Sequence, residues 1–384
     1  MEKLKKKAEV VIIGGGIMGL STAYYLARAG CRDIVLVERD LLAQASTGLS
    51  VGGIRQQFSH PANIILSQKS IEVFENFQEE FGQDISFHQV GYLFLAQQDQ
   101  TWKDFLAGVE QQKAYGVQVE ICQPSEIEHR WPYLYVSDLK GGTLSPRDGY
   151  ADPYLVAMGF AQAARKLGVS LEEKTEAVGI EIKEGRIRKI QTNRGAIYTH
   201  IVVNSAGAWA KEVAKMAGLD LPINPYRRQV FVTKAFPDIT EPIPLVIDMD
   251  NSFYFRREGA GILMGKNDPE EPPSFNTNLD WSRLEEVTAA AIHRVPILEK
   301  AEILKGWAGL YAVTPDSNPI IGALSEIEGF FCAAGFSGHG FQHGPAVGQI
   351  LSEFILKRKT EFDLSPFTYG RFKREELKGE RRVI

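Results

Sequence analysis

A glycine-rich segment near the start of the sequence has the spacing of a dinucleotide-binding turn. Gly14, Gly16 and Gly19 follow the pattern G-x-G-x-x-G directly after the apolar run Glu9–Ile13. The first glycine allows a tight turn, the second lets a pyrophosphate approach the backbone, and the third lets the next helix pack closely on the strand. Glu38 ends the following apolar run, where a carboxylate accepts hydrogen bonds from ribose hydroxyls. The pattern predicts a bound dinucleotide and does not distinguish FAD from NAD.

The other reactive side chains argue against several kinds of site. Cys31, Cys122 and Cys332 stand far apart without a C-x-x-C pair, so neither a zinc cluster nor a disulfide framework is predicted. The histidines lack metal-ligand spacing, so no metal site is predicted, and no G-x-S-x-G nucleophile motif occurs. The 43 Lys and Arg against 48 Asp and Glu give a net charge of −5, which argues against nucleic-acid binding through bulk positive charge.

The elements that would position the glycine turn form a βαβ unit. A strand up to Ile13 leads through the turn into a helix that ends at Ala29, and Gly30 is a typical residue at a helix C-terminus. A second strand, 34–37, follows at once. This arrangement predicts a parallel sheet with the turn at its carboxyl edge.

The length of 384 residues, with 44% hydrophobic and 24% charged residues, predicts two globular domains. We expect an α/β fold in which a Rossmann-like dinucleotide-binding domain is interleaved with an α+β substrate domain built on an antiparallel sheet. The first domain is expected over 1–86, 150–225 and 305–384, and the second over 87–149 and 226–304.

Several further elements support this division. Helices are expected over 62–81, from Asp152-Pro153 to Leu167, and over 345–357. A small antiparallel meander is expected over 178–183, 187–192 and 197–203. No apolar stretch reaches about 18 residues, so no transmembrane segment is expected. We predict a cytoplasmic protein, with peripheral membrane association left open.

Five segments of the sequence are similar to the D-amino-acid oxidase superfamily, in the branch of sarcosine oxidase and of the β subunits of heteromeric sarcosine oxidases and proline dehydrogenases. They are Val11–Gly19, Gly53–Phe58, Asn204–Trp209, Thr314–Pro319 and Ala333–Phe341. The resemblance extends over essentially the whole chain and implies FAD as the cofactor. It does not specify the substrate.

The resemblance also implies where FAD would lie. In this family FAD is extended, with its pyrophosphate on the first helix and its flavin against the turn 335–342, where the last helix can stabilise negative charge on the reduced ring. Cofactor contacts are thus expected from Gly14, Gly16, Ile17, Met18, Gly19, Glu38, Arg39, Ser46, Thr47, Gly48, Gly53, Val178, Ala206, Gly207, Trp209, Gly309, Gly335, Ser337, Gly338, His339, Gly340, Phe341 and Gln342.

Three positions depart from the sarcosine oxidase pattern. Gly309 stands where a cysteine holds the flavin covalently in the monomeric enzymes, so noncovalent FAD is expected. Gln342 replaces the lysine that grips the substrate carboxylate. Leu263 aligns with the lysine that activates oxygen, which favours a dehydrogenase over an oxidase, although Lys266 is near enough to supply a cation if the alignment shifts.

The expected catalytic residues are Arg55, Tyr254, His339 and Gln342. Arg55 matches a family arginine suited to a substrate carboxylate; its alternative is a structural salt bridge. Tyr254 matches a tyrosine facing the flavin, with a half-buried sheet aromatic as the alternative. For His339 we favour orienting the flavin loop, and His343 is either a base or a solvent-facing residue at the helix start.

The predicted function is oxidation of a small amine or amino acid, of the N-methyl, imino or glycine/proline type, by hydride transfer to flavin N5, which gives an imine. The electron acceptor would be oxygen, a quinone or a partner flavoprotein, and heteromeric subunits are possible. Two alternatives remain open. One is a 2-hydroxy-acid dehydrogenase, which needs a base. The other is a noncatalytic FAD-bearing assembly factor. Phe253–Gly259 and Leu364–Phe372 are similar to mitochondrial FAD-oxidoreductase-domain proteins that assist respiratory complex assembly.

Overall fold

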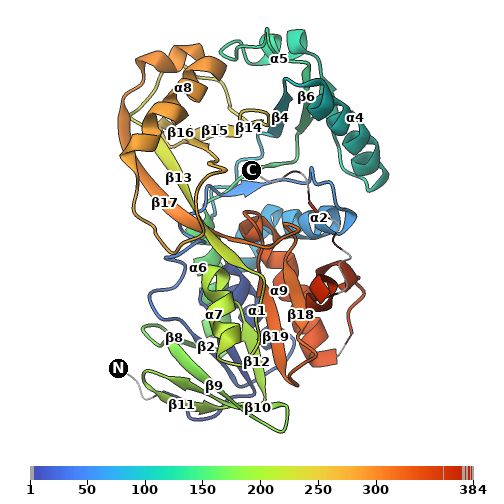
Figure 1. Cartoon of the computed structure of the whole chain (residues 1–384), viewed down its shortest axis with the longest axis vertical. Helices are drawn as coiled ribbons and strands as arrows, with labels where there is room; N and C mark the ends of the chain where they lie inside the picture. The colour runs from blue at the N-terminus through green and yellow to red at the C-terminus, as the bar shows by residue number, and fades with distance from the viewer. Residues whose placement is uncertain (1–3, 358, 374–376, 378, 381, 383–384) are drawn as a thin grey trace.

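The computed structural model describes residues 4–357, 359–373, 377, 379–380 and 382. Two sheets organise the chain, one in the lower half and one in the upper half of Figure 1, and the paired strands β13 and β17 extend between them. Each half is assembled from segments that are distant in the sequence. The expected interleaved α/β fold is confirmed.

The lower sheet has six strands in the order β18-β19-β12-β1-β2-β8. The pairs β8–β2, β2–β1, β1–β12 and β12–β19 are parallel, and β18 is antiparallel to β19. Read from β8, the parallel strands come third, second, first, fourth and fifth along the chain, which is the order of a doubly wound dinucleotide-binding sheet. The strands are β1 (Val10–Ile13), β2 (Ile34–Val37), β8 (Ser170–Glu172), β12 (Ile201–Asn204), β18 (Ile320–Ala323) and β19 (Phe330–Ala334).

Both faces of this sheet are covered. Successive side chains of a strand point to opposite faces, and in β1 Val10 and Ile12 belong to one apolar cluster while Val11 and Ile13 belong to another. The first face packs against α1 (Ile17–Arg28), α2 (Pro61–Glu75), α6 (Pro153–Lys166) and α9 (Gly340–Lys357). The second packs against α7 (Ala210–Lys215) and the small sheet of β9 (Ala177–Lys183), β10 (Arg186–Thr192) and β11 (Gly195–Tyr198).

Helices α1 and α9 approach each other closely because α9 carries glycine at the contact. A Cβ atom on Gly348 would lie 2.5 Å from Ser21 Oγ, and one on Gly344 would lie 2.4 Å from Ile17 Cγ1. Ser21 Oγ also donates to the Gly344 carbonyl at 2.9 Å. This contact fixes the start of α9 against the start of α1, so the two helix N-termini lie close together.

The upper sheet has eight strands in the order β17-β13-β16-β15-β14-β4-β6-β5. It is antiparallel as expected, except that β14 pairs in parallel with β4, where the two visits of the chain to this domain meet. Its strands are β4 (Tyr92–Ala96), β5 (Glu120–Cys122), β6 (Gly141–Ser145), β13 (Asn224–Thr233), β14 (Leu245–Asp248), β15 (Phe253–Glu258), β16 (Gly261–Lys266) and β17 (Ile303–Val313). The helices of this half are α4 (Asp99–Ala114), α5 (Pro124–Arg130) and α8 (Leu284–Arg294). None of the described helices is long and apolar enough to cross a membrane.

The remaining elements are short. β3 (Gly53–Ile54) and β7 (Gly149–Tyr150) form a two-stranded sheet, α3 is Phe77–Phe81, and the 3-10 helices are η1 (Gly207–Trp209), η2 (Trp281–Arg283), η3 (Pro296–Lys300), η4 (Ser365–Phe367) and η5 (Tyr369–Lys373).

Four sequence expectations differ from the structure in detail. The third meander strand, 197–203, is two strands in two sheets, because the chain leaves β11 and enters the central sheet as β12. The helix expected over 62–81 is broken at Asn76. Helix α9 begins at Gly340 and contains Pro345, earlier than the expected start. The domain boundary expected at residue 305 falls inside β17, all of which lies in the eight-stranded sheet.

Candidate active site

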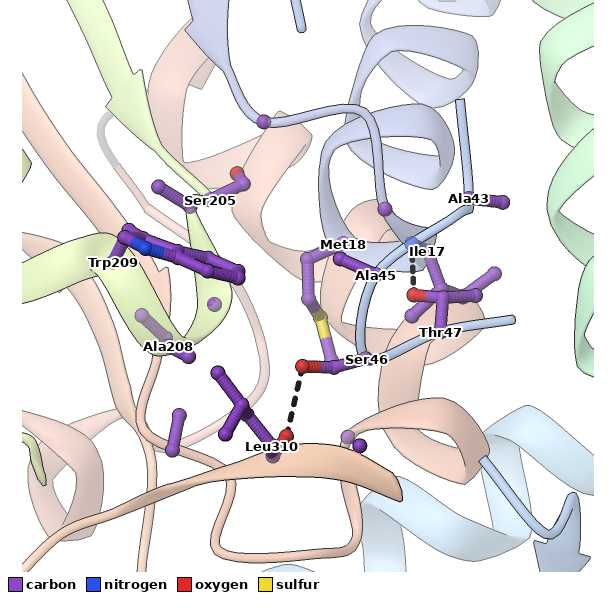
Figure 2. Close-up of a pocket in the computed structure, with 18 of the residues that line it drawn as sticks. Ile17, Met18, Ala43, Ala45, Ser46, Thr47, Ser205, Ala208, Trp209 and Leu310 are labelled. Carbon is purple, nitrogen blue, oxygen red and sulfur yellow. Dashed lines mark hydrogen bonds between the residues drawn. The ribbon is translucent and has the colours of Figure 1, made fainter. Parts of the chain in front are cut away.

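A cavity of about 520 Å³ lies where the two sheets meet. It is lined by the turn before α1, the end of β2, residues 43–51, η1, the centre of β17 and the turn after β19. Figure 2 shows Ser205, Ala208 and Trp209 on one side of the space, with Met18, Ser46 and Thr47 opposite. Cavities of this size hold cofactors and small ligands.

The turn before α1 requires glycine at two of its three motif positions. Gly14 has φ +112°, and a Cβ atom there would lie 2.4 Å from the Ser205 carbonyl oxygen. A Cβ atom on Gly19 would lie 2.0 Å from the Gly14 carbonyl oxygen, which is closer than any side chain tolerates. The backbone at the start of α1 is therefore open on the cavity side.

The first turn of α1 offers backbone donors to an anion. Its N-cap residue, Gly16, supplies no side-chain cap. Thr47 Oγ1, from the facing loop, accepts a hydrogen bond of 3.1 Å from the Ile17 amide (Figure 2). The other first-turn amides have no partner within the helix, and the helix dipole is positive at this end. A pyrophosphate group suits this position.

Glu38, at the end of β2, is fixed beside the turn. Its Oε2 accepts a hydrogen bond of 2.7 Å from the Gly15 amide, and its Oε1 accepts one of 2.9 Å from the Asp40 amide. Arg39 lies over the ring of Trp209, with 3.9 Å between its Cζ and the ring centroid. The adenosine end of the cavity thus has an acid for ribose and an aromatic wall.

The opposite end of the cavity is formed by the turn between β19 and α9. Ser337 in this turn has φ +49°, and its Oγ accepts a hydrogen bond of 3.2 Å from the Thr314 amide. Ser46 Oγ donates to the Leu310 carbonyl at 2.8 Å, and Trp307 Nε1 donates to the Leu49 carbonyl at 3.0 Å (Figure 2 shows the first of these). These bonds hold the loop 46–49 against β17 and close the cavity along one side.

Three polar side chains from the eight-stranded sheet face this end of the cavity: Arg228 of β13, Tyr254 of β15 and Tyr311 of β17. Burial, followed by the neighbouring Tyr311 hydroxyl, raises the pKa of Tyr254, and burial raises the pKa of Tyr311. Both phenols are therefore neutral hydrogen-bond donors near neutral pH. Tyr254 was expected from the sequence, whereas Arg228 and Tyr311 were not.

Arg55, Gln342 and the two histidines of α9 and its preceding turn lie behind the cavity wall. The guanidinium of Arg55 donates to the Gln57 carbonyl at 2.6 Å and to the Arg382 carbonyl, and it stacks on Phe58 with 3.8 Å between Cζ and the ring centroid. Burial and the charge of Arg55 lower the pKa of His339 to about 3, and burial also lowers the pKa of His343. Both histidines are neutral at physiological pH.

Comparison with known proteins assigns the fold to a family. Residues 9–354 match the model of the family described as FAD dependent oxidoreductase. The chain belongs to this family.

Relatives within the FAD dependent oxidoreductases agree with this assignment. Mitochondrial dimethylglycine dehydrogenase of Rattus norvegicus is 33% identical over 96% of this chain and 45% of its own length, so the chain spans less than half of that relative. FAD-dependent oxidoreductase domain-containing protein 1 of Xenopus laevis is 33% identical over 99% of this chain and 85% of its own length. The crystal structure of L-proline dehydrogenase from P. horikoshii has a TM-score of 0.91 and 37% identity, and covers 98% of this chain and 100% of that one.

The cavity fits the FAD that this oxidoreductase family uses. A cradle that only glycine permits, unpaired helix amides and the fixed Glu38 suit the ADP half, and the largely apolar remainder ends at the turn before α9. Of the expected cofactor residues, those that line the cavity are Gly14, Gly16, Ile17, Met18, Glu38, Arg39, Ser46, Thr47, Ala206, Gly207, Trp209, Gly309, Gly335, Ser337, Gly338, Gly340 and Phe341.

Six expected cofactor residues of this oxidoreductase do not line the cavity: Gly19, Gly48, Gly53, Val178, His339 and Gln342. Gly19 and Gly48 instead allow neighbouring backbone segments to pack closely. A Cβ on Gly48 would lie 2.3 Å from the Ala43 carbonyl oxygen. Val178 is exposed, and its neighbour Ala177 lines the cavity, as the alternation of β9 requires. His343 is fully buried, so the solvent-facing alternative for it is wrong.

The structure also defines the surroundings of Gly309 and Leu263, two positions where the sequence departs from the sarcosine oxidase pattern. Gly309 lines the cavity, and no cysteine or histidine does so within the described part of the chain. Leu263 is completely buried in the sheet, and Lys266 is not among the cavity residues. Among the described residues no group of His, Cys, Asp or Glu side chains could hold a metal ion.

Proposed function

We propose that this chain is an FAD-dependent enzyme that oxidises a small amine or amino acid, of the N-methyl, imino or glycine/proline type, to an imine. The observation that carries the proposal is the continuity of one cavity from a dinucleotide cradle at α1 to an enclosed end bearing Arg228, Tyr254 and Tyr311. Relatives named dimethylglycine dehydrogenase and L-proline dehydrogenase support the substrate class.

The chain's own residues would bind and orient the substrate in a water-poor space. When bound, FAD supplies the acceptor for a hydride taken from the carbon beside the amine nitrogen. Beside Arg228, the described residues offer no strong base, because both tyrosines stay protonated and His339 lies behind the wall. An amine that enters neutral needs none, since its own lone pair drives the transfer and positioning does the rest.

The described cavity lining contains no histidine, and its acids (Glu38, Asp40, Glu176 and Glu212) belong to segments other than those that carry Arg228, Tyr254 and Tyr311. This counts against a 2-hydroxy acid, whose hydroxyl proton must be removed. A noncatalytic FAD-bearing role remains the second candidate, because the Xenopus laevis relative named only for its oxidoreductase domain is matched over 85% of its length.

We further propose a dehydrogenase that reacts slowly with oxygen. Leu263 aligns with the oxygen-activating lysine of the sarcosine oxidase pattern, and its apolar, completely buried side chain supplies no cation there. A quinone or a partner flavoprotein then takes the electrons, and further subunits could form part of the enzyme. The three cysteines are free and buried, which fits a reducing compartment. The cytoplasm is the compartment we propose, although relatives such as dimethylglycine dehydrogenase are named mitochondrial.

Anaerobic mixing of the FAD-loaded protein with secondary amino acids, glycine, proline, simple amines and hydroxy acids tests the proposal, with the flavin absorbance band as the readout. We expect bleaching by at least one amino acid and slow recovery in air. Bleaching by hydroxy acids alone would point to the other enzyme class. An unchanged flavin with every compound would favour the noncatalytic role.

A further inference from the structure

Arg228 occupies an unusual position among the arginines near the cavity. On β13, Arg228 and Val230 line the cavity, whereas Arg227 and Gln229 point to the opposite face. Arg227 is neutralised there by Glu271, at 3.0 Å from each carboxylate oxygen. Of the two adjacent arginines only Arg228 lines the cavity, although both border a small hollow beside Glu271.

The guanidinium of Arg228 stays unneutralised within the part of the chain that the structure describes. Its Nη1 donates to the Arg227 carbonyl at 2.9 Å, and its Nε is buried without a hydrogen-bond partner in the described structure. No acid of the described residues forms an ion pair with it, whereas the other cavity cations, Arg39 and Lys174, both pair with Asp40. A buried donor of this kind is costly unless something binds it.

The residues around Arg228 leave room for a ligand and add further donors. Arg228 lies opposite Gly309 in the β13–β17 register, so no side chain stands beside it on that strand. The side chain of Tyr254 lies over Gly265, and a Cβ atom on Gly265 would be 2.4 Å from the Tyr254 hydroxyl oxygen. Tyr311 lies over Gly338, where a Cβ would be 2.3 Å from its ring, and its ring centroid is 5.2 Å from the Arg228 Cζ.

Both tyrosine hydroxyls are available for hydrogen bonding to a ligand, because neither bonds to another residue of the described chain. One cation and two neutral O–H donors at one end of a cavity match the two acceptor oxygens of a carboxylate. Arg55, the position expected from the sequence, already donates to the carbonyls of Gln57 and Arg382.

We propose that Arg228, with the hydroxyls of Tyr254 and Tyr311, forms the subsite for the substrate carboxylate. This inference deepens the proposed function and rests on it, since it selects amino acids over simple amines. Arg228 would be the specificity-determining residue, and the carboxylate would neutralise its charge.

Equilibrium binding tests the subsite without turnover. FAD-loaded protein is titrated with pyrrole-2-carboxylate and with its uncharged analogue pyrrole-2-carboxamide, and the flavin absorbance change and the heat of binding are recorded. We expect the parent to prefer the carboxylate by about tenfold or more, and Arg228→Gln to lose about 10- to 100-fold in carboxylate affinity with little change for the amide. Arg228→Lys should retain an intermediate affinity, because it keeps the charge and loses the planar fork.

Lys305→Gln on β17 is the matched control, since it removes the same charge from an exposed position outside the cavity. FAD content and circular dichroism establish that each variant folds. Carboxylate affinity that is unchanged in both Arg228 variants, or a parent that binds the amide as tightly as the carboxylate, would overturn the subsite.

Anaerobic flavin reduction separates this inference from the proposed function. If Arg228-dependent carboxylate binding occurs but no amine reduces the flavin, the oxidation proposal fails and the carboxylate subsite stands. If amino acids reduce the flavin with the same concentration dependence in the parent and in Arg228→Gln, the subsite fails and the oxidation proposal stands.

Discussion

The backbone amide of Arg55 donates a hydrogen bond of 2.7 Å to Oε1 of Gln342. This bond ties the end of β3, near the start of the chain, to the first turn of α9, near its end. Both residues are buried, with Gln342 only 4% exposed, so water does not replace the bond if it is lost. Gln342 therefore positions the segment that follows β3, although sequence comparison suggested a role at the substrate.

Replacing Gln342 by leucine should destabilise the protein through this bond. The Arg55 amide would be left buried without an acceptor, at a cost of about 1–3 kcal/mol. We expect a lower urea midpoint for the FAD-loaded variant. Gln349→Leu, on an exposed face of the same helix, is the control and should leave the midpoint within about 0.5 kcal/mol of the parent. Equal effects of the two substitutions would show that the Arg55 bond contributes little.

Gly265→Ala should disturb Tyr254 while sparing the cofactor. The new Cβ would lie 2.4 Å from the Tyr254 hydroxyl oxygen, so the ring must move. Overpacking of this kind costs about 1–3 kcal/mol. We expect a normal FAD content together with at least about tenfold weaker binding of pyrrole-2-carboxylate. In the control Gly179→Ala, the new Cβ would make an ordinary contact of 3.6 Å with Gln191, and binding should be unchanged. Loss of FAD in Gly265→Ala alone would place Tyr254 in a different role.

FAD should be released intact by acid precipitation. Gly309 carries no nucleophile, and no cysteine or histidine lines the described cavity. After precipitation and centrifugation we expect the yellow colour and the flavin absorbance in the supernatant. A yellow pellet that keeps its flavin through denaturing electrophoresis would contradict this expectation.

The buried ionisable groups should give stability a dependence on pH. The pKa of His339 falls from 6.5 to about 3, so its neutral form stabilises the fold above pH 6.5, and this contribution is lost as the pH falls towards 3. The urea midpoint of His339→Gln, relative to that of the parent, should therefore be higher at about pH 5 than at about pH 7.5.

The contribution of Asp148 to stability changes with pH in the opposite direction, so this residue serves as the internal comparison. Burial raises its pKa from 3.8 to about 7, so its contribution is present at low pH and is lost as the pH rises through 7. The urea midpoint of Asp148→Asn, relative to that of the parent, should be higher at about pH 7.5 than at about pH 5. Parallel pH profiles for the parent and both variants would show that neither group titrates as its burial requires.

The glycine turn, Glu38 and the order of the first elements could be predicted from the sequence because they depend on local spacing. Arg228 could not, since it stands next to Arg227 and the sequence alone does not say which of two adjacent charges faces inward. That choice is set by the pairing of β13 with β17, more than 70 positions later in the chain. The strand alternation separates Arg227 from Arg228, but only the structure shows that the face of Arg228 and Val230 lines the cavity.

The role expected for Arg55 depended on a resemblance, and the structure places its side chain among backbone carbonyls instead. Its hydrogen bond with Gln342 joins distant segments, and no spacing in the sequence reveals such a contact. The split of the third meander strand has a similar cause. Residues 199–200 carry no pattern that separates β11 from β12, and only the competition between two sheets divides them.

The interleaving of the two sheets also has a consequence for biosynthesis. β1 pairs with β12, and β12 in turn pairs with β19, so the lower sheet is incomplete until residue 334 has left the ribosome. The upper sheet likewise waits for β17, which ends at Val313. Neither half can close before β17 has been synthesised, and the cavity acquires its last wall only when α9 emerges. Cofactor capture must therefore wait until α9 has emerged, and a chain truncated before α9 would expose unpaired strand edges in place of a folded domain.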